Sequence, residues 1–288
     1  MQPPLTREFK SRHGVAGYGV TGSGPAVILQ HGTPTNSVIW STVIERLRKH
    51  FTLYYLDLPG YGASAKFEGQ DVRLRAFAQT MRDFALHLGL ERPHLVGHDF
   101  GAATVLGAHL VEGLEVCSIT VVDGVVLSPW GTPFSRHVKE HEDVFAAVPA
   151  YVHEAVLEAH LKTGVSRVMD AVTMRSLLNP WTGVEGQRAY YRQVGQYDYE
   201  YTVRLEKLYP DLKVPVAIIW GEEDRWVNVS EGQRLRRLIA HASFDSLPDA
   251  GHFCMIDVPH LLSNVLHAAL VRASKTGTAP VRMVTDAS

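Results

Sequence analysis

The stretch His94-Leu95-Val96-Gly97-His98-Asp99-Phe100-Gly101-Ala102-Ala103 decides the fold of this protein. Its first three residues predict a buried strand, and the segment from Ala102 onward is a good helix start, so a sharp turn joins a strand to a helix. Glycines flank such a turn because the strained backbone of the central residue leaves little room for neighbouring side chains. Asp99 therefore stands at the tip of the turn, as either a nucleophile or an ordinary helix N-cap.

Five further short runs share the pattern of this strand, although the last of them, residues 243–247, shows it more weakly, and segments of helical period alternate with them. Between two of the runs, apolar residues from Leu74 to Leu88 recur at helical spacing, and Gly89 is a plausible end for that helix. This alternation is typical of βα units on a mainly parallel sheet, so the predicted fold class is α/β. The five runs are residues 26–30, 52–56, 118–122, 216–220 and 243–247.

The alternation stops between residues 126 and 210, where helical patterns rich in His, Tyr and Trp run without a buried strand. We interpret this segment as a helical cap inserted into an α/β core formed by residues 1–125 and 211–274. A cap can close an apolar cavity over the strand ends and exclude water. Residues 275–288 show no periodicity and are predicted to form a flexible tail.

The composition favours a small-molecule enzyme over a nucleic-acid or membrane protein. The chain has 288 residues, 45% of them hydrophobic, and a formal net charge of -2 with acidic and basic residues intermixed. Such a charge pattern provides no strongly basic surface for nucleic acid or for an anionic membrane. It favours a small, largely apolar substrate. Two cysteines and the lack of an apolar leader suggest a cytoplasmic protein, which we expect to be a monomer or a homodimer.

Three other loops carry candidate catalytic residues and follow strands at the same edge of the predicted sheet. One is His31-Gly32-Thr33-Pro34, which follows an early strand, and another is Gly221-Glu222-Glu223-Asp224, which places an acid at the end of a later strand. The third is Asp249-Ala250-Gly251-His252-Phe253, after the last strand signal. Nucleophile, acid and base then follow one another along the chain as Asp99, Asp224 and His252. Glu222, Glu223 and Asp123 are the alternatives for the acid.

On these motifs, and on the turn Asp57-Leu58-Pro59-Gly60-Tyr61-Gly62-Ala63-Ser64, the chain resembles the α/β-hydrolase superfamily over nearly its whole length. Most members of that superfamily carry Ser at the sharp turn, whereas this chain carries Asp99. The resemblance then narrows to the branch of epoxide hydrolases and haloalkane dehalogenases. It implies an enzyme that opens a small electrophilic substrate by way of a covalent ester.

The chemistry that the resemblance implies needs no cofactor. A carboxylate attacks an sp³ carbon by displacement and becomes the acyl part of an ester, which water must then hydrolyse. His252, oriented by Asp224, would act as the general base for that water. The backbone N–H groups of Thr33 and Phe100 would stabilise the oxyanion. The histidines show no paired spacing typical of metal ligands, so we expect no metal.

Two related chemistries differ in the groups that stabilise the leaving atom. Hydroxyl donors suit an alkoxide, whereas indole or amide N–H donors suit a halide. Haloalkane dehalogenases typically have Trp after the nucleophile and Asn in the early loop, where this chain has Phe100 and Thr33, and haloacid-cleaving relatives place Arg after the nucleophile. These differences favour an epoxide hydrolase. A haloalkane dehalogenase with an atypical halide site is the alternative, and a capped ligand-binding protein with little turnover is a further one.

Epoxide hydrolases use two cap tyrosines that donate to the epoxide oxygen. The resemblance makes Tyr191 the better match for one of them, with Tyr190 as the fallback, and Tyr151 a loose match for the other. The expected pocket is lined by the early loop and by aromatic residues of the cap. Its expected lining residues are His31, Pro34, Trp130, Trp181 and Tyr190.

Overall fold

A computed structural model describes residues 5–276 and shows an eight-stranded sheet. The strand order is β1-β2-β4-β3-β5-β6-β7-β8, in which β2 is antiparallel to β1 and β4 and all other neighbours are parallel. This arrangement confirms the predicted α/β fold class. The strands are β1 (Arg7–Ser11), β2 (Gly14–Gly22), β3 (Ala26–Gln30), β4 (Thr52–Leu56), β5 (His94–His98), β6 (Ser118–Val122), β7 (Val216–Gly221) and β8 (Ser243–Leu247).

The six strands predicted from apolar runs are β3 to β8, and their bounds differ from the predicted ones by no more than two residues. The hairpin of β1 and β2 was not predicted from the sequence. Glycines interrupt the apolar alternation of β2, and both strands lie at one edge of the sheet, where they are only partly buried. The hydrophobic signal is therefore weakest there, because an edge strand needs little apolar surface.

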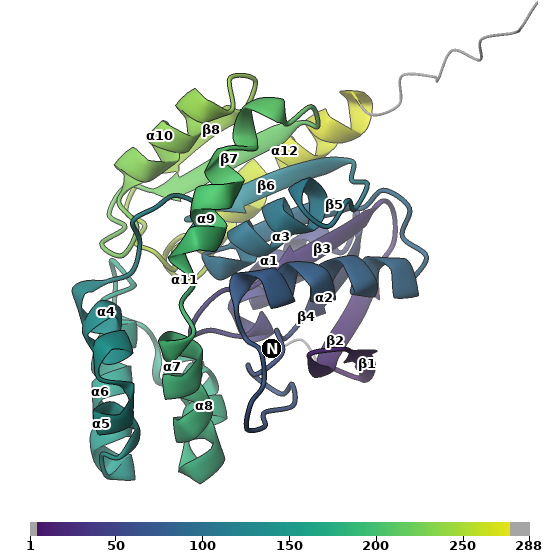
Figure 1. Ribbon diagram of the computed structural model, residues 1–288. Coiled ribbons are helices and arrows are strands. Elements are labelled where there is room, and N and C mark those ends of the chain that lie inside the picture. Colours follow the sequence, from purple (N-terminus) through teal and green to yellow (C-terminus); the bar gives the residue numbers. More distant parts are fainter. Residues whose placement is uncertain (1–4, 277–288) are drawn as a thin grey trace, which may run out of the picture.

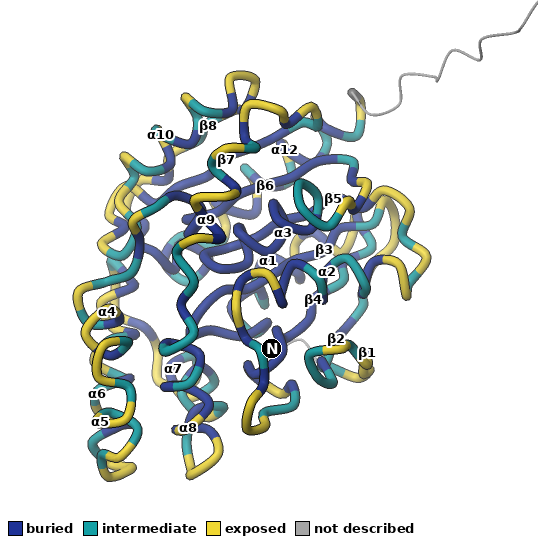
Figure 2. Tube along the Cα trace, in the orientation of Figure 1, coloured by how far each residue is buried: buried dark blue, intermediate teal, exposed yellow. Residues whose placement is uncertain are grey.

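Helices cover both faces of the sheet (Figure 1). On one face α2 (Leu74–His87) packs against α3 (Phe100–Leu110). On the other face α1 (Ser41–Leu47) packs against α12 (Pro259–Thr276). The remaining core helices are α10 (Val229–Leu238) and α11 (Cys254–Asp257). The central strands and the start of α3 form the buried interior (Figure 2), which holds the turn at Asp99 rigidly in place.

Six helices lie between β6 and β7, in the segment where the sequence predicts an inserted cap. The helices α4 to α8 form a separate layer beside the carboxyl ends of the strands, in the lower left of Figure 1. The last helix, α9, packs instead against α3 of the core, so the cap itself ends before it. The bounds are α4 (Pro133–Glu140), α5 (Glu142–Ala146), α6 (Ala150–Lys162), α7 (Ala171–Leu178), α8 (Gly183–Gly195) and α9 (Tyr199–Glu206).

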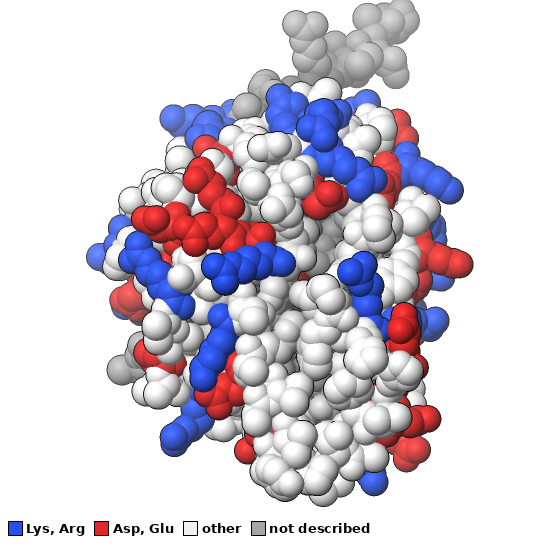
Figure 3. All heavy atoms as spheres, turned by 90° about the vertical axis from the view of Figure 1, so that its left-hand side faces the viewer, with Lys and Arg blue, Asp and Glu red and all other residues white. Residues whose placement is uncertain are grey.

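Helix α12 extends two residues past the predicted end of the core at residue 274. Residues 275 and 276, predicted to begin a tail, belong to α12, and the rest of the predicted tail lies outside the described residues. Within residues 5–276, no helix is both long and apolar enough to span a bilayer. On the face in Figure 3, acidic and basic side chains are intermixed over the upper part, whereas the lower part, formed by the cap, is mostly uncharged.

Candidate active site

The turn between β5 and α3 holds Asp99 in a strained conformation, with φ 54° and ψ -120°. A Cβ added at Gly97 would lie 2.2 Å from the carbonyl oxygen of Gly101, and one added at Gly101 would lie 2.3 Å from that of Gln30. Only glycine fits at either position. The side chain of Asp99 makes no capping hydrogen bond to α3. The turn therefore presents the carboxylate to the space above the sheet, and the helix-cap interpretation is wrong.

The early loop supplies a backbone donor to this carboxylate. The N–H of Thr33 donates to Oδ1 of Asp99 at 2.6 Å. A Cβ at Gly32 would lie 2.2 Å from the same oxygen, so the loop can approach this closely only because residue 32 is glycine. Phe100 is the first residue of α3, so its N–H has no acceptor within the helix. The two amides predicted to form an oxyanion site therefore stand next to Asp99.

Asp99, His252 and Asp224 lie together and are almost completely buried. Nδ1 of His252 lies 2.9 Å from Oδ2 of Asp224, and Nε2 lies 3.3 Å from Oδ2 of Asp99. The other carboxylate oxygen of Asp224 accepts the backbone N–H groups of Trp226 and Val227 at 2.8 and 2.9 Å. These bonds fix Asp224 as the carboxylate that orients the imidazole.

The other acids considered for the role of Asp224 do not contact the imidazole of His252. Glu222 and Glu223 are exposed at the surface of the loop. Asp123 is buried at the end of β6, where Oδ1 accepts the N–H of Gly221 at 2.7 Å, and burial together with the nearby charge of Asp224 raises its pKa well above the usual value. Asp123 therefore supports the loop that carries Asp224 and does not contact the imidazole.

His252 holds a proton more tightly than an ordinary histidine. Burial by itself lowers the pKa of this imidazole, but the charge and hydrogen bond of Asp224 and the contact with Asp99 outweigh burial and raise it to about 10. The imidazole is thus positively charged between two carboxylates at neutral pH. Any reaction that neutralises Asp99 removes one of these causes and makes His252 a stronger proton donor.

A small pocket opens over Asp99 between the core loops and the cap. Its walls combine aromatic side chains with hydroxyl and amide groups. No Lys or Arg is among the lining residues, so the pocket suits a small uncharged molecule. The core supplies Thr33, Pro34, Asp99, Phe100, Val125, Trp226 and Val227, and the capping segment supplies Trp130, Gly131, Thr132, Ser135, His160, Tyr190, Gln193 and Tyr197.

Two of the predicted tyrosines do not reach this pocket. Tyr151 lies on the outer side of α6 and is 76% exposed. Tyr191 is buried, but its hydroxyl lies 3.0 Å from Nδ1 of His153, and Tyr191 is not among the residues that line the pocket. Neither phenol can donate to a substrate on Asp99, so the prediction that these two activate the oxygen is wrong. Tyr190, the fallback, lines the pocket.

His31 and Trp181 are also absent from the lining, contrary to prediction. Nε2 of His31 accepts the N–H of Leu58 at 2.9 Å behind the loop, and the indole of Trp181 donates to the carbonyl oxygen of Pro34 at 2.7 Å. Both side chains therefore help to hold the early loop in position. They make no contact with the pocket interior.

The indole groups beside the pocket are already engaged as donors. Nε1 of Trp130 donates to the hydroxyl of Thr202 at 2.9 Å, and Nε1 of Trp226 donates to that of Thr163 at 2.8 Å. Trp130 therefore lines the pocket as predicted but presents only its ring. An indole cradle for a halide is not formed by these residues.

Sequence reasoning missed Gln193 and Tyr197, although both lie at helical spacing from Tyr190. Oε1 of Gln193 accepts the hydroxyls of Tyr61 at 2.8 Å and of Thr33 at 3.0 Å. Its Nε2 is buried and has no hydrogen-bond partner among the described residues. The positions 190, 193 and 197 follow an i, i+3, i+7 pattern that marks one face, but the sequence does not reveal which face meets the pocket.

An aromatic stack links the cap to His252. The ring of Trp226 stacks on His252 with centroids 4.9 Å apart, and the ring of His160 from α6 stacks on Trp226 at 4.3 Å with 8° between the planes. Burial, with the charge of His252, lowers the pKa of His160 to about 4, so its imidazole is neutral at pH 7. This stack fixes the plane of the His252 ring and adds a neutral polar group to the pocket wall.

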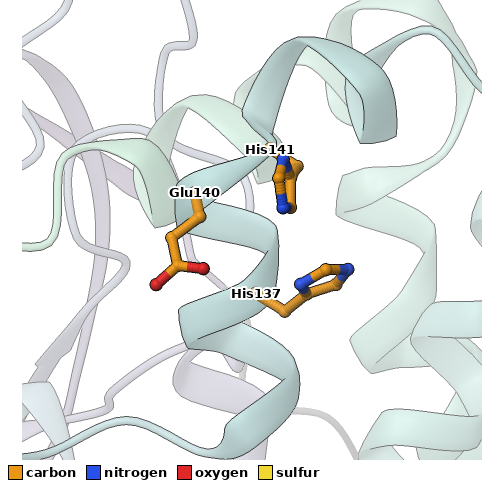
Figure 4. A group of neighbouring side chains, drawn as sticks. All are labelled: His137, Glu140 and His141. Carbon is orange, nitrogen blue, oxygen red and sulfur yellow. The ribbon is translucent and has the colours of Figure 1, made fainter.

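The expectation that no histidines show metal-ligand spacing is also wrong. His137 and His141 lie four residues apart at the end of α4, with Glu140 beside them (Figure 4). The cluster is exposed and lies outside the pocket lining. Its spacing was readable from the sequence, because two histidines at i and i+4 share one side of a helix.

Comparison with known proteins places the chain in a family. The alpha/beta hydrolase fold family matches residues 25–259, and the chain belongs to it. A crystal structure of an alpha/beta hydrolase fold protein from Burkholderia ambifaria is 33% identical, with a TM-score of 0.89 over 92% of this chain and 98% of that one.

Two relatives with named activities are also similar. A fluoroacetate dehalogenase from Burkholderia sp is 29% identical over an alignment of 273 positions that covers 87% of this chain and 88% of the relative. Haloalkane dehalogenase 2 from Mycobacterium bovis is 28% identical over an alignment of 277 positions that covers 90% of this chain and 92% of the relative. Together with the fold, these relatives identify the chain as a hydrolase.

Proposed function

We propose that this hydrolase opens epoxides to vicinal diols through an ester formed on Asp99. The observation that carries the proposal is the set of donors around the carboxylate. The hydroxyl-bearing Tyr190 and Tyr197 line the pocket, whereas the indole N–H groups of Trp130 and Trp226 donate elsewhere. Burial raises the pKa of both phenols above the usual value, so both keep their protons and can donate at neutral pH.

The first step forms a bond between Oδ2 of Asp99 and one epoxide carbon while the bond from that carbon to the epoxide oxygen breaks. Oδ1 stays on the N–H of Thr33, which keeps the attacking oxygen oriented. The new alkoxide accepts hydrogen bonds from the tyrosines and takes up one proton. The charged imidazole of His252 can supply that proton, because ester formation removes the charge of Asp99 that helps to hold it.

The second step hydrolyses the ester. Neutral His252, still held by Asp224, takes a proton from water, and the resulting hydroxide attacks Cγ of Asp99. The N–H groups of Thr33 and Phe100 would stabilise the tetrahedral oxyanion, a contribution of about 3 kcal/mol for each donor. Collapse of the tetrahedral intermediate breaks the bond from Cγ to the substrate oxygen, and the proton left on the attacking hydroxyl passes to that oxygen. Release of the diol leaves the carboxylate of Asp99 and the imidazolium of His252, so charge and protons balance over the cycle.

Intact-protein mass spectrometry of a His252→Gln variant tests this proposal. The variant lacks the base for the second step, so we expect it to gain the mass of the whole epoxide after incubation with a panel of small epoxides. The double variant His252→Gln with Asp99→Asn is the matched control and should gain nothing. An adduct that persists in the double variant, or no adduct with any epoxide, would contradict an ester on Asp99.

Dehalogenation is a second candidate, favoured by the unpartnered amide of Gln193 and by the names of the two relatives. An amide N–H is a suitable donor for a leaving halide. The pocket lining contains no cation to bind a haloacid carboxylate, so the substrate in this case would be a neutral haloalkane. The same mass experiment separates the two candidates, because a haloalkane would add its mass minus that of the hydrogen halide.

A further inference from the structure

A second group of chemically capable side chains lies at the carboxyl end of α4, away from Asp99. The segment His137-Val138-Lys139-Glu140-His141 brings two imidazoles and one carboxylate together (Figure 4). One ligand atom from each of His137, Glu140 and His141 lies within 4.8 Å of the others, and all three residues are exposed. We propose that these three side chains bind a divalent transition-metal ion such as Zn²⁺.

The backbone already has the geometry that such a site needs. His141 ends α4 and precedes α5, with φ -132° and ψ 37°, and its ring centroid lies 4.6 Å from that of His137. Zinc bonds of about 2.0–2.1 Å require ligand atoms roughly 3.4 Å apart in a tetrahedral site. Rotation of exposed side chains can supply this small approach without a backbone change.

The surroundings leave the three ligands available. The ring of Phe145 meets that of His137 edge-on, with centroids 5.7 Å apart, and supports the imidazole from one side. The nearby ammonium of Lys139 donates to the carbonyl oxygen of Gly195 at 2.8 Å. Within residues 5–276, no Lys or Arg forms a salt bridge with Glu140. The carboxylate is therefore free to bind a cation.

The chemistry of the ligands predicts which ions bind. Two imidazoles and one carboxylate suit Zn²⁺, Co²⁺, Ni²⁺ and Cu²⁺, whereas Mg²⁺ and Ca²⁺ prefer oxygen ligands alone. Three protein ligands leave at least one position to water. The bound ion would join the last turn of α4 to the start of α5, and Ser135 on α4 lines the pocket. Metal binding should therefore stabilise the cap.

The test uses the full chain without an affinity tag, treated with chelator and then dialysed. Zn²⁺ binding is measured by calorimetry and Co²⁺ binding by visible absorption, for the wild type and for His137→Ala, His141→Ala and Glu140→Gln. The matched control is the double variant His50→Ala with His267→Ala, which removes another histidine pair with ring centroids 4.8 Å apart. We expect one ion per chain in wild type and control, with affinity weakened roughly tenfold or more in each cluster variant.

Thermal unfolding supplies a second measurement that does not depend on enzymatic activity. Zn²⁺ should raise the Tm of the wild type and the control, and should raise it less in the cluster variants. Circular dichroism checks that the variants fold, which we expect because the substituted side chains are exposed. Binding of equal strength in wild type and cluster variants, equal affinity for Mg²⁺, or no binding at millimolar Zn²⁺ would each overturn the proposal.

Discussion

The two walls of the pocket differ in how firmly their polar groups are held. On the core side, Asp99 accepts the N–H of Thr33, and Asp224 accepts two backbone N–H groups while it holds His252. On the cap side, Nε2 of Gln193 has no partner among the described residues. The core therefore presents fixed groups suited to chemistry, and the cap presents donors that are left for a ligand.

This difference follows from the two kinds of scaffold. The core groups stand at the ends of parallel strands, where sheet register and buried backbone bonds set their positions. The cap groups project from α6, from α8 and from the turn after α8, so the rotation of each helix decides which side chains face inward. Substitutions in the core should therefore abolish the reaction or the fold, whereas substitutions in the cap should alter rate and selectivity.

The largest effect is expected for Asp99→Asn. Asn tolerates a positive φ and has nearly the same shape, but its amide is a poor nucleophile. Turnover of any substrate identified by the mass experiment should fall by roughly 10⁴-fold or more. Steady-state kinetics measures the loss, with an unchanged circular dichroism spectrum as the control for folding. A variant that keeps a tenth of wild-type activity would show that Asp99 is not the nucleophile.

The second effect concerns pH and the charge on His252. Its folded-state pKa is raised to about 10, above the unfolded value of 6.5, so the stabilisation is fully present below pH 6.5 and is lost as pH rises toward 10. The loss amounts to about 1.4 kcal/mol for each unit of pH within that window. Denaturant unfolding of the wild type and of His252→Gln between pH 6 and 10 measures this loss. The difference between their free energies of unfolding should shrink as the pH rises. A difference that grows with pH would contradict a charged His252.

A third substitution probes the packing that holds the elbow. Gly101→Ala places a Cβ 2.3 Å from the carbonyl oxygen of Gln30 and should cost about 3 kcal/mol in the free energy of unfolding. Gly113→Ala is the control, because that glycine has a positive φ but nothing within 4 Å of an added Cβ. Its cost should be about 1 kcal/mol. Equal costs at the two positions would mean that the elbow is not tightly packed.

Substitutions of cap tyrosines should have smaller effects on kcat, and the size of each effect should depend on whether the phenol lines the pocket. If the tyrosines activate the substrate oxygen, Tyr197→Phe and Tyr190→Phe should each lower kcat with an epoxide by roughly 10-fold to 100-fold. Tyr191→Phe is the matched control from the same helix as Tyr190, because its phenol lies against His153. Its kcat should stay within a factor of about two. A larger loss for Tyr191→Phe than for the other two would restore the original prediction.

The smallest effect is expected at Tyr151, which is 76% exposed on α6. Tyr151→Phe removes a hydroxyl that contacts neither the pocket nor a neighbour in the described part of the chain, so stability should change by less than about 0.5 kcal/mol. The kinetic constants should be unchanged. Any clear loss of kcat would mean that α6 turns toward the pocket during the reaction.

Much of the core could be predicted from the sequence because its signals are local. Five of the six predicted strands, β3 to β7, are short apolar runs that are largely buried, and the turn at Asp99 is marked by two glycines that no other residue can replace. The order of Asp99, Asp224 and His252 follows from strands that end at the same edge of one sheet. The sequence therefore implies that these three residues meet.

The inner face of the cap was decided only by the tertiary structure. Tyr190 and Tyr191 are adjacent in sequence, yet one lines the pocket and the other contacts His153, because successive residues of a helix point about 100° apart. Gln193 shares the face of Tyr190, and Tyr197 follows in the turn after α8, but these side chains form the pocket wall only when α8 packs against the core loops. The sequence by itself determined the fold and a nucleophile held in a strained turn. Packing of the cap determined which donors stand over that nucleophile.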